Sequence, residues 1–543
     1  MQENIWKIKA KAPIHKSQNW LTLLLAKNRE LTTKEKLNRF LNPKLADILK
    51  ISLSDTQKAI ERIKKAVKNR QKIIVYSDYD ADGICATAIM CETLYDLGAQ
   101  VLPYVPHRIK EGYGLSNPAI DKLAKKGVKL IITVDQGVTA NDQVAHAKSL
   151  GLDVVITDHH ILPKKLPQAH ALVHTTDLCG AGVAWRLCWE IVKKVSPSYK
   201  ERLVEKLELA ALATIADLVP LLSANRAIVK IGLEKLQKTR RPGIKALVKS
   251  SGFNSQVGTY EIGHILAPRI NAMGRLEHAM DSLRLLCAKN QKQAQELAQL
   301  LSKTNSKRQD LTKKAITHAM QMVDGENQIG IISHHLWHEG IIGLVAARLV
   351  ETHHKPMIVI SRGEVYSKGS ARSVPGFNIV EAIRSSSELL VDAGGHPMAA
   401  GFTIETKYIE EFTKRLTFYA QSQISGELLK PIINIECELD KNDINGKTLT
   451  TIKLFEPYGV SNPQPVFLTR KMLVEDVRCV GATGQHLKLQ LDGFGAIGFN
   501  MGGIKTEMRP GYLVDLVYIL TEDNYNDNGK LQLKIKDLAI APN

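Results

Sequence analysis

Short apolar runs alternate with helical patterns from residue 73 to about residue 160. The runs are rich in Val, Ile and Leu, and the patterns between them repeat apolar positions at helical spacing. Strand candidates cover 73–76, 100–105, 129–134 and 153–157, and helix candidates include Asn117–Lys126 and Asn141–Leu150. This succession is typical of βαβ units. We therefore expect an α/β domain with a mainly parallel sheet.

The pattern changes twice further along the chain. Helices dominate from about 182 to 320, and Gln291–Met322 contains no proline and suits a long connecting helix. A second α/β block over about 327–420 begins with the strand Ile329–Ile332. After Pro431 short β runs separated by Gly and Asn turns predict a small barrel, with strands that include 432–435, 486–491 and 531–535.

Length agrees with several domains, because 543 residues exceed one ordinary domain. We expect an N-terminal extension (1–45), a first α/β domain (46–285), a linking helix (286–325), a second α/β domain (326–425) and a β-barrel (426–543).

Hydrophobic residues make up 44% of the chain, yet no apolar run approaches the ~20 residues that span a bilayer. The start, MQENIWKIKAKAP, lacks the apolar core of a secretory signal. Seven scattered cysteines form no Cys-x-x-Cys pair, which favours reduced thiols over zinc or redox chemistry. These features predict a cytoplasmic protein that does not bind membranes.

The chain is strongly basic. It has 73 Lys and Arg against 55 Asp and Glu, a formal net charge of +18. Such an excess favours a polyanionic partner, most often nucleic acid. Charge alone is weak evidence and has to be joined to a site.

Three aspartates lie at alternate positions in SDYDADG, residues 77–83. Asp78, Asp80 and Asp82 follow the strand candidate 72–76 and precede the helix candidate 84–91. Ligand sites of open α/β sheets usually lie at this end of a strand. A solvated turn would explain the segment equally well if it stood alone.

Other strand candidates also end in polar side chains. VKLIITVDQG ends at Asp135, and LDVVITDHH ends at Asp158, His159 and His160. A further acid, Asp217 in ATIADLVPL, follows a helical stretch of small residues and could join them. Taken singly, Asp135 suits a helix N-cap and the His pair a solvated turn. Together they predict a metal site at one edge of the sheet, since chance rarely places such residues at the ends of three neighbouring strands.

Carboxylates mixed with imidazole suit Mn²⁺ or Mg²⁺. The number of ligands favours two ions, which can activate water and hold both the attacking and leaving oxygens of a phosphate.

The motifs as a set resemble those of the DHH phosphoesterase superfamily, and within it the RecJ exonuclease family. The resemblance rests on DYDADG, VDQG, TDHH and ATIADLVPL, together with HRIKEGYGL, GAGVAW, APRINAMGRL, WHEGIIG, KGSARS and GGHPMAAGF. It implies a DHH domain, a long linking helix, a DHHA1 domain and a C-terminal OB-fold.

The resemblance also implies a function. A RecJ-like chain would be a metal-dependent 5′→3′ exonuclease that degrades single-stranded DNA to 5′-mononucleotides in recombination and repair. A single-stranded-DNA-binding protein and a RecQ-type helicase would be its partners, and it would act as a monomer. Residue by residue, the resemblance gives metal-ligand positions to Asp80, Asp82, Asp135, His159 and Asp217. It places Asp158 and His160 beside the ions as catalytic residues, and gives Asp78 the task of holding the loop through backbone N–H groups.

The second α/β block and neighbouring motifs of the first domain offer groups that would bind phosphate. Arg275, Ser370 and Arg372 are suitable types, because guanidinium binds phosphate through paired donors. His396 in GGH would donate to the scissile phosphate, and His338, His107 and Arg108 are further candidates. Surface ion pairs are the alternative for Arg275 and Arg372, and a plain turn is the alternative for the glycines of GGH. A structural His-Arg pair is the alternative for His107 and Arg108.

Two other functions remain open from the sequence. A DHH phosphoesterase of small substrates would share the metal ligands, but such proteins usually end after GGH, and here about 120 residues with barrel character follow. A non-catalytic DNA-binding scaffold would have lost its ligands, whereas all the expected types are present. In the barrel, Phe467, Phe494 and Phe499 are available to stack on bases, although core positions suit them better.

Overall fold

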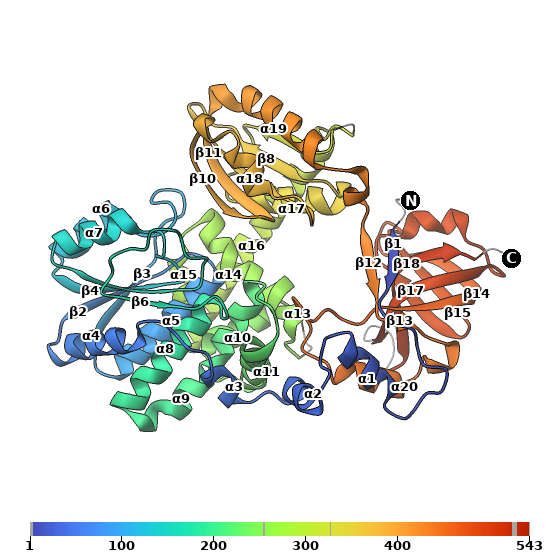
Figure 1. Ribbon diagram of the computed structural model, residues 1–543, viewed down its shortest axis with the longest axis horizontal. Coiled ribbons are helices and arrows are strands. Elements are labelled where there is room, and N and C mark those ends of the chain that lie inside the picture. The colour runs from blue at the N-terminus through green and yellow to red at the C-terminus, as the bar shows by residue number, and fades with distance from the viewer. Residues whose placement is uncertain (1–3, 254–255, 326, 524–528, 542–543) are drawn as a thin grey trace.

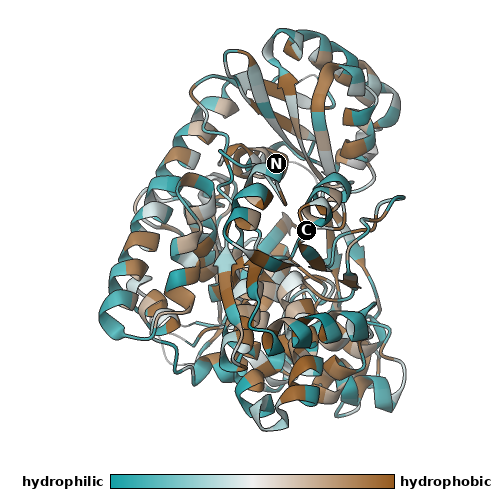
Figure 2. Cartoon of the chain, turned by 90° about the vertical axis from the view of Figure 1, so that its left-hand side faces the viewer, coloured by the Kyte–Doolittle hydropathy of each residue, from teal (hydrophilic) through white to brown (hydrophobic). Residues whose placement is uncertain are grey.

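The computed structural model describes residues 4–253, 256–325, 327–523 and 529–541. Its three parts are an α/β part with a helical extension at the left of Figure 1, a second α/β part at the top, and a β-rich part at the right. Hydrophobic residues gather on the strands and on the inward faces of helices, while the outer turns are hydrophilic (Figure 2). Each part has hydrophobic clusters of its own.

The sheet of the first α/β part has five strands, all parallel to their neighbours. Their order is β3 (Gln100–Tyr104), β2 (Lys72–Tyr76), β4 (Val128–Val134), β5 (Asp153–Asp158) and β6 (Ala171–His174). Helices cover both faces: α4 (Thr56–Lys68), α5 (Ala81–Asp96) and α8 (Gly180–Val195) on one, α6 (Asn117–Lys125) and α7 (Asn141–Ser149) on the other. The predicted parallel sheet is confirmed, and its continuous apolar strands follow from burial on both faces.

A helical layer follows the sheet. It contains α9 (Lys200–Glu205), α10 (Leu207–Ala216), α11 (Ser223–Gln237), α12 (Pro242–Ser250), α14 (Ala267–Leu276) and α15 (Met280–Leu286). The predicted linking helix is α16 (Gln291–Met320), which at 30 residues is about 45 Å long. α12, α14 and α15 pack on it from the first part, and α17 (Ile342–His353) packs on it from the second. This helix therefore joins the two α/β parts.

The second sheet is mixed. Its order is β10 (Leu390–His396), β11 (Ala399–Glu405), β9 (Tyr366–Arg372), β8 (Met357–Ser361) and β7 (Gly330–His334), and only β7 and β8 run parallel. α17, α18 (Ile379–Arg384) and α19 (Ile409–Gln423) pack on it. In the register of β10, β11 and β9, Ala399 pairs with both His396 and Arg372. The two predicted functional residues thus lie at the same end of the sheet.

The β-rich part is a closed five-stranded barrel. β14 (Phe467–Val480), β15 (His486–Leu491), β16 (Phe494–Gly498), β18 (Leu531–Ile540) and β17 (Leu513–Glu522) follow one another, and β17 pairs back with β14. The short β13 (Cys437–Glu438) lies beside β14. The barrel prediction is confirmed, but its assignment of 432–435 is wrong. That run is β12 (Ile432–Ile435), which pairs outside the barrel with β1 (Ile5–Ile8).

The N-terminal segment belongs to the barrel's core. α1 (Trp20–Lys27) and α2 (Lys34–Leu41) contribute Leu21, Leu25 and Phe40 to the same hydrophobic cluster as the barrel strands and α20 (Gly446–Lys453). From α2 the chain passes through α3 (Leu45–Leu49), which packs against α11 of the first part. The described part of the segment 1–45, expected as an extension, therefore packs with the far end of the sequence through β1, α1 and α2.

No helix within the described ranges has the length and apolar character needed to cross a membrane.

Candidate metal centre

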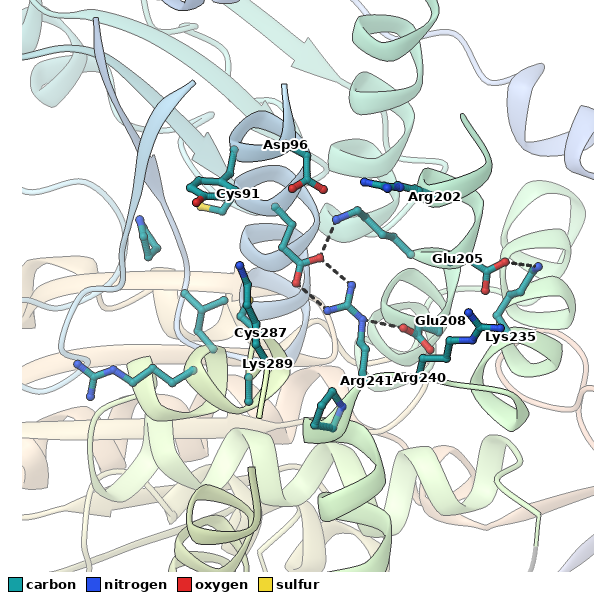
Figure 3. A pocket seen from close by; sticks show the side chains of 18 of the residues that line it. Cys91, Asp96, Arg202, Glu205, Glu208, Lys235, Arg240, Arg241, Cys287 and Lys289 are labelled. Carbon is teal, nitrogen blue, oxygen red and sulfur yellow. Dashed lines mark hydrogen bonds and ion pairs between the residues drawn. The ribbon is translucent and has the colours of Figure 1, made fainter. Parts of the chain in front are cut away.

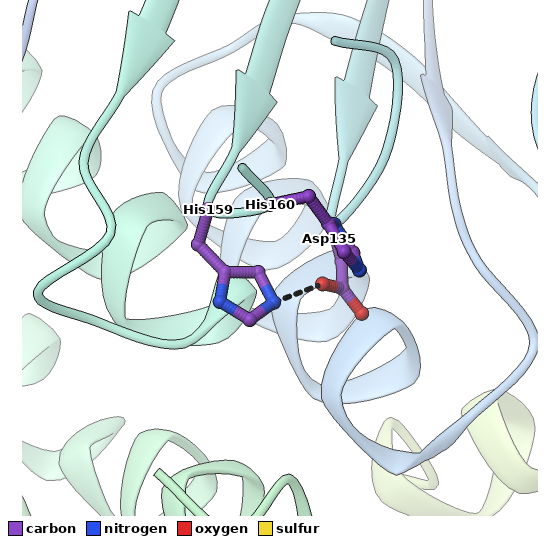
Figure 4. Close-up of side chains that lie close together, drawn as sticks. All are labelled: Asp135, His159 and His160. Atoms are coloured by element: carbon purple, nitrogen blue, oxygen red, sulfur yellow. Dashed lines mark ion pairs between the residues drawn. The ribbon is translucent and has the colours of Figure 1, made fainter. Parts of the chain in front are cut away.

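The polar residues that end the parallel strands come together at one edge of the first sheet. His159 lies at the centre: its Nε2 is 3.1 Å from Asp135 Oδ1, 3.6 Å from Asp217 Oδ2 and 3.8 Å from Asp82 Oδ2. Figure 4 shows His159 pointing at Asp135, with His160 beside it. The sequence prediction placed these side chains at one edge because the carboxyl ends of parallel strands meet there.

The loop after β2 delivers Asp80 and Asp82 in different ways. Asp80 is the N-cap of α5, and its Oδ1 accepts the N–H groups of Asp82 and Gly83 at 2.9 and 3.0 Å. Asp82 is fully buried and accepts the N–H groups of Gly180 and Ala181, both at 2.7 Å. These two donors belong to the first turn of α8, where the helix dipole favours negative charge. Helix α8 thereby fixes the Asp82 carboxylate.

Asp158 holds the histidines rather than facing the cluster. Its Oδ1 accepts the N–H of His159 at 2.7 Å and Nδ1–H of His160 at 2.7 Å, while Oδ2 accepts the N–H of Val138 at 3.0 Å. Burial alone would lower the pKa of His160, but the hydrogen bond and charge of Asp158 outweigh it and raise this pKa to about 9. Asp158 is therefore a positioning residue for His160.

The carboxylates raise one another's pKa. Burial, followed by the charge of Asp80, raises the pKa of Asp82 to about 7. Burial and the charges of Asp82 and Asp80 raise the pKa of Asp217 to about 8 and also raise that of Asp135. Burial and His160 lower the pKa of His159 to about 4, which keeps its imidazole neutral and able to bind a metal. A divalent cation would relieve this repulsion.

The donor set fits Mn²⁺ or Mg²⁺ on geometry as well. Three groups of side chains each bring ligand atoms within 4.8 Å of one another: Asp82, His159 and Asp217; Asp78, Asp80 and Asp135; and Asp135, His159 and His160. Within the described ranges, Oδ1 of Asp78 and Oδ1 of Asp135 are buried without a hydrogen-bond partner. Oxygen atoms left in this way beside imidazole nitrogens are what a hard divalent cation requires.

Asp78 lies with the other carboxylates and also bonds the loop. As the family resemblance implies, its carboxylate accepts a backbone N–H of the loop, that of Tyr79, and it also lies with Asp80 and Asp135. Burial and the charge of Asp80 raise its pKa well above the ordinary range. The alternate spacing of the three aspartates could have indicated that Asp78 lies with the other carboxylates, because alternate residues of an extended segment share one side.

Arginines from both α/β parts gather beside the carboxylates. Arg275 of α14 donates to the carbonyl of Gly340 at 3.1 Å, across the boundary between the two parts. Burial, followed by the charges of Arg108, Arg308 and Arg372, lowers the pKa of Arg275 to about 9, and Asp80 partly offsets them. Arg372 donates to Ser370 Oγ at 3.3 Å and to the carbonyl of Ala371 at 2.8 Å. Across the described ranges, none of these four arginines is in an ion pair with a carboxylate.

The remaining predicted residues differ in what they contact. His396 is exposed on β10, and its charge lowers the pKa of His159 across the boundary. Arg108 stacks over the Tyr79 ring at 4.9 Å, whereas the His107 ring packs on His278. His338 Nδ1 accepts the N–H of Gly340 at 3.0 Å and so stabilises the loop in which His338 itself lies.

Three residues of the site were not singled out from the sequence. Tyr113, in the EGYGL motif, places its ring 6.4 Å from that of His160. Asn271, in APRINAMGRL, accepts the N–H of Ala81 at 2.7 Å and so holds the start of α5. Arg308 stands on α16, has a buried Nε without a partner among the described residues, and affects the pKa of Arg275. The first two lie in quoted motifs, but nothing marks Arg308 on a polar helix.

Gly180→Ala is expected to damage the centre. A Cβ at this position would lie 2.5 Å from Cβ and 2.6 Å from Oδ1 of Asp135, so the carboxylate has to move. Such a shift typically costs about 10²-fold in rate. Steady-state cleavage by purified protein measures it. Gly258→Ala is the control, because its added Cβ meets only the end of the Glu261 side chain. Equal activity of the two variants would contradict the geometry.

A large cavity lies elsewhere, beside the C-terminal end of α5, and Figure 3 shows the side chains that line it. It has a volume of about 1150 Å³, and its inner charges pair with one another. Arg241 donates to Glu92 at 2.7 Å and to Glu208 at 2.6 Å, and Lys206 donates to Glu92 at 2.6 Å. Because these charged side chains already neutralise one another, we infer that they hold α5 and α10 together. We therefore place the catalytic reaction at the carboxylate centre and not in this cavity.

Glu92 gives a pH-dependent stability prediction. Burial would raise its pKa, but Arg241 and Lys206 outweigh it and lower the pKa from 4.5 to about 2. The depressed value contributes stability that is present above about pH 4.5 and lost as the pH falls toward 2. Glu92→Gln should therefore lower the melting temperature at pH 7. The difference in melting temperature between the variant and the unmodified chain should become smaller as the pH falls. Asp142→Asn, an exposed control, should show neither effect. A difference that is constant with pH would contradict the ion pair.

Three family models match the chain. They are the DHH family, N-terminal domain, over residues 72–216, the DHHA1 domain over 309–422 and the RecJ OB domain over 435–537. The single-stranded-DNA-specific exonuclease RecJ of Bacillus subtilis is 36% identical, over 96% of this chain and 68% of that protein. RecJ of Thermus thermophilus solved with Mn²⁺ is similar with a TM-score of 0.85 and 29% identity, covering 99% of this chain and 80% of that one. The same protein solved with Mg²⁺ gives a TM-score of 0.78 and 28% identity, covering 99% and 79%.

Fold and centre together define a metal-dependent phosphoesterase of the DHH class, with a DHHA1 domain and an OB barrel attached. The matches to RecJ proteins extend over almost the whole chain, with 36% identity to the B. subtilis protein. The chain therefore belongs to the RecJ family.

Proposed function

We propose that the chain is a metal-dependent exonuclease that removes 5′-mononucleotides from the 5′ end of single-stranded DNA, in DNA recombination and repair. The observation that carries the proposal is the position of the unpaired arginines directly beside the carboxylate centre. A terminal phosphate bound by these arginines would bring the first phosphodiester to the metal ligands. The B. subtilis relative is named a single-stranded-DNA-specific exonuclease.

Two ions fit the centre, since the group of Asp82, His159 and Asp217 shares no member with that of Asp78, Asp80 and Asp135. When bound, Mn²⁺ or Mg²⁺ supplies Lewis acidity at the scissile phosphate and lowers the pKa of water.

The protein's own groups bind and orient the substrate. Arg275, Arg372 and Ser370 bind the terminal phosphate, and Arg108 adds positive charge beside them. His160, held protonated by Asp158, donates to the phosphate from one side, and His396 donates from the second α/β part. These contacts hold the reacting atoms in place for the displacement.

The barrel binds the strand that trails from the site. Phe467 is buried in the barrel's core, as the core alternative predicts, whereas Phe499 is 52% exposed with Lys534 5.3 Å from its ring. An exposed aromatic beside a cation is suited to stack on a base and bind its phosphate. We infer that Phe499 takes this role.

The partners and location follow from the substrate. We propose that the chain acts as a monomer in the cytoplasm, where single-stranded DNA arises. A single-stranded-DNA-binding protein and a RecQ-type helicase are the predicted partners, from the family resemblance alone.

End-labelled single-stranded DNA tests the proposal. DNA labelled at the 5′ or the 3′ end is incubated with Mn²⁺, Mg²⁺ or chelator, beside Asp135→Ala. Immediate release of 5′-labelled mononucleotide, lost with chelator and in the variant, is the expected result. Intact long DNA together with hydrolysis of a dinucleotide would favour a small-substrate phosphoesterase instead. Early release of the 3′ label would show that the enzyme degrades DNA from the 3′ end and would contradict the proposed polarity.

Binding to single-stranded DNA should depend strongly on salt. Each neutralised phosphate contributes a slope of about −0.7 to the plot of log affinity against log salt concentration. A net charge of +18 supplies the cations for several such contacts. Fluorescence anisotropy of a labelled oligonucleotide measures the slope, with Ca²⁺ in place of the catalytic ion to prevent cleavage. A flat salt dependence would argue against a basic path for the strand.

A further inference from the structure

We propose that Arg226 is a latch that fixes the barrel against the first α/β part, and so positions the barrel for the trailing DNA strand. The inference rests on the proposed function for its link to DNA. Its structural basis is one buried cation whose donors reach two segments far away in the sequence.

Arg226 lies on α11 and is only 1% exposed. Its Nε donates to the carbonyl of Phe40 at 2.6 Å, and Nη1 donates to the carbonyl of Pro457 at 3.1 Å. Nη2 donates to the carbonyls of Phe455 and Glu456 at 3.0 and 2.6 Å. The guanidinium also stacks over the Phe40 ring at 3.7 Å. One side chain thus joins α11, the end of α2 and the segment that leads into the barrel.

The cation has no carboxylate partner in the described part of the chain. Burial lowers its pKa to about 10, so it remains charged at neutral pH. A buried charge is tolerated only where its donors are satisfied, and here backbone carbonyls satisfy them. Because the guanidinium fork is planar, those carbonyls must keep their relative positions. The contact therefore specifies a geometry between segments, which a flexible ammonium would not.

The rest of the junction is sparse. The described hydrogen bonds between residues 46–290 and the barrel part from 435 onward come from Arg226, apart from the N–H of Leu221, which donates to the carbonyl of Val460 at 2.8 Å. Lys230, one turn further along α11, adds a bond to the carbonyl of Leu41. The hydrophobic clusters of the two parts are separate. In Figure 1 this junction lies at the bottom, between the left and right parts. With so few other contacts, the angle of the barrel depends on Arg226.

The centre itself lies away from the latch. Asp217 is the C-cap of α10, and Arg226 lies on the next helix, α11. The donors of Arg226 reach Phe40 and residues 455–457, and none of these is a candidate ligand. Loss of the latch should leave the metal centre intact and release the barrel. A long strand, which needs both, would then bind less tightly, whereas a short one would not.

The test compares strands of two lengths in the full chain. Arg226→Met removes the donors and keeps much of the volume, and Arg240→Met removes the same charge from an exposed position with no described partner. The short strand has about three nucleotides and the long one about 40, beyond the roughly 4–16 nucleotides that one OB fold covers. We expect the KM for the long strand to rise about tenfold in Arg226→Met while kcat on both strands stays within about twofold, as expected for lost uniform binding. Arg240→Met should match the unmodified chain.

Two results would overturn the latch: an unchanged KM for the long strand, or an equal loss on both strands. Lys230→Met, which removes a single bond from the same junction, should give a smaller shift of the same kind and decides the matter if Arg226→Met does not fold. X-ray scattering provides a readout that does not depend on cleavage. A larger radius of gyration in the latch variant supports the proposal, and an unchanged one contradicts it. If the unmodified chain degrades no DNA, the proposed function fails while scattering still judges the latch.

Discussion

Asp135→Asn is expected to lower DNA cleavage by at least about 10³-fold, a loss of about 4 kcal/mol of transition-state stabilisation. Asp135 belongs to two of the three ligand groups, and its Oδ1 lies 3.1 Å from His159. An amide keeps the size of the side chain but removes the charge that binds a cation. The metal-free variant should also melt at a higher temperature, because the repulsion between Asp135 and the charges of Asp82 and Asp80 is removed.

Thermal melts with and without Mn²⁺ separate these effects. Mn²⁺ should raise the melting temperature of the unmodified chain, since a ligand that binds only the folded state stabilises it. The rise should be much smaller in Asp135→Asn. Asp142→Asn, on the exposed side of α7, serves as the control and should keep both the activity and the response to Mn²⁺. Full activity in Asp135→Asn would mean that the chemistry lies outside this centre.

The sequence predicted the metal centre because its information is local. Each ligand follows an apolar run, and the edge at which parallel strands end is fixed by βαβ geometry. The separate tasks of the acids could not be predicted in this way. Asp82 is held by the N-terminus of α8, about 100 residues away, and Asp158 faces backbone donors and His160. Those tasks depend on which donors the folded chain brings to each oxygen.

Long-range pairings were also beyond the sequence. β1 and β12 are both ordinary apolar runs, and neither pattern names its partner more than 420 residues away. Arg226 left no signal either, because its acceptors are backbone carbonyls, which every residue has. An arginine that binds a carboxylate can be matched with an acidic residue in the sequence. An arginine that binds backbone carbonyls has no such partner residue type, so the sequence does not indicate the contact.

Arg372→Met is expected to raise the KM for 5′-phosphorylated single-stranded DNA by about 10- to 100-fold, since charge-assisted hydrogen bonds contribute about 1.5–3 kcal/mol. Arg372 has no carboxylate partner within the described ranges, and burial and the charge of Arg108 lower its pKa, so a bound anion would be strongly favoured. Arg372→Lys should recover only part of the loss, because a lysine cannot bind the phosphate through two parallel donors.

Comparison of DNA with a 5′-phosphate and with a 5′-hydroxyl identifies the group that Arg372 binds. The unmodified chain should prefer the phosphate, and Arg372→Met should lose the preference by weakening only the phosphorylated strand. The control is Arg384→Met, an exposed arginine at the end of α18, which should change neither KM. If both strands weaken equally in Arg372→Met, the guanidinium binds an internal phosphate, and the preference for the 5′ end must come from Arg275 or Arg108. The polarity of cleavage would then be set on the side of the first α/β part, where those two arginines stand.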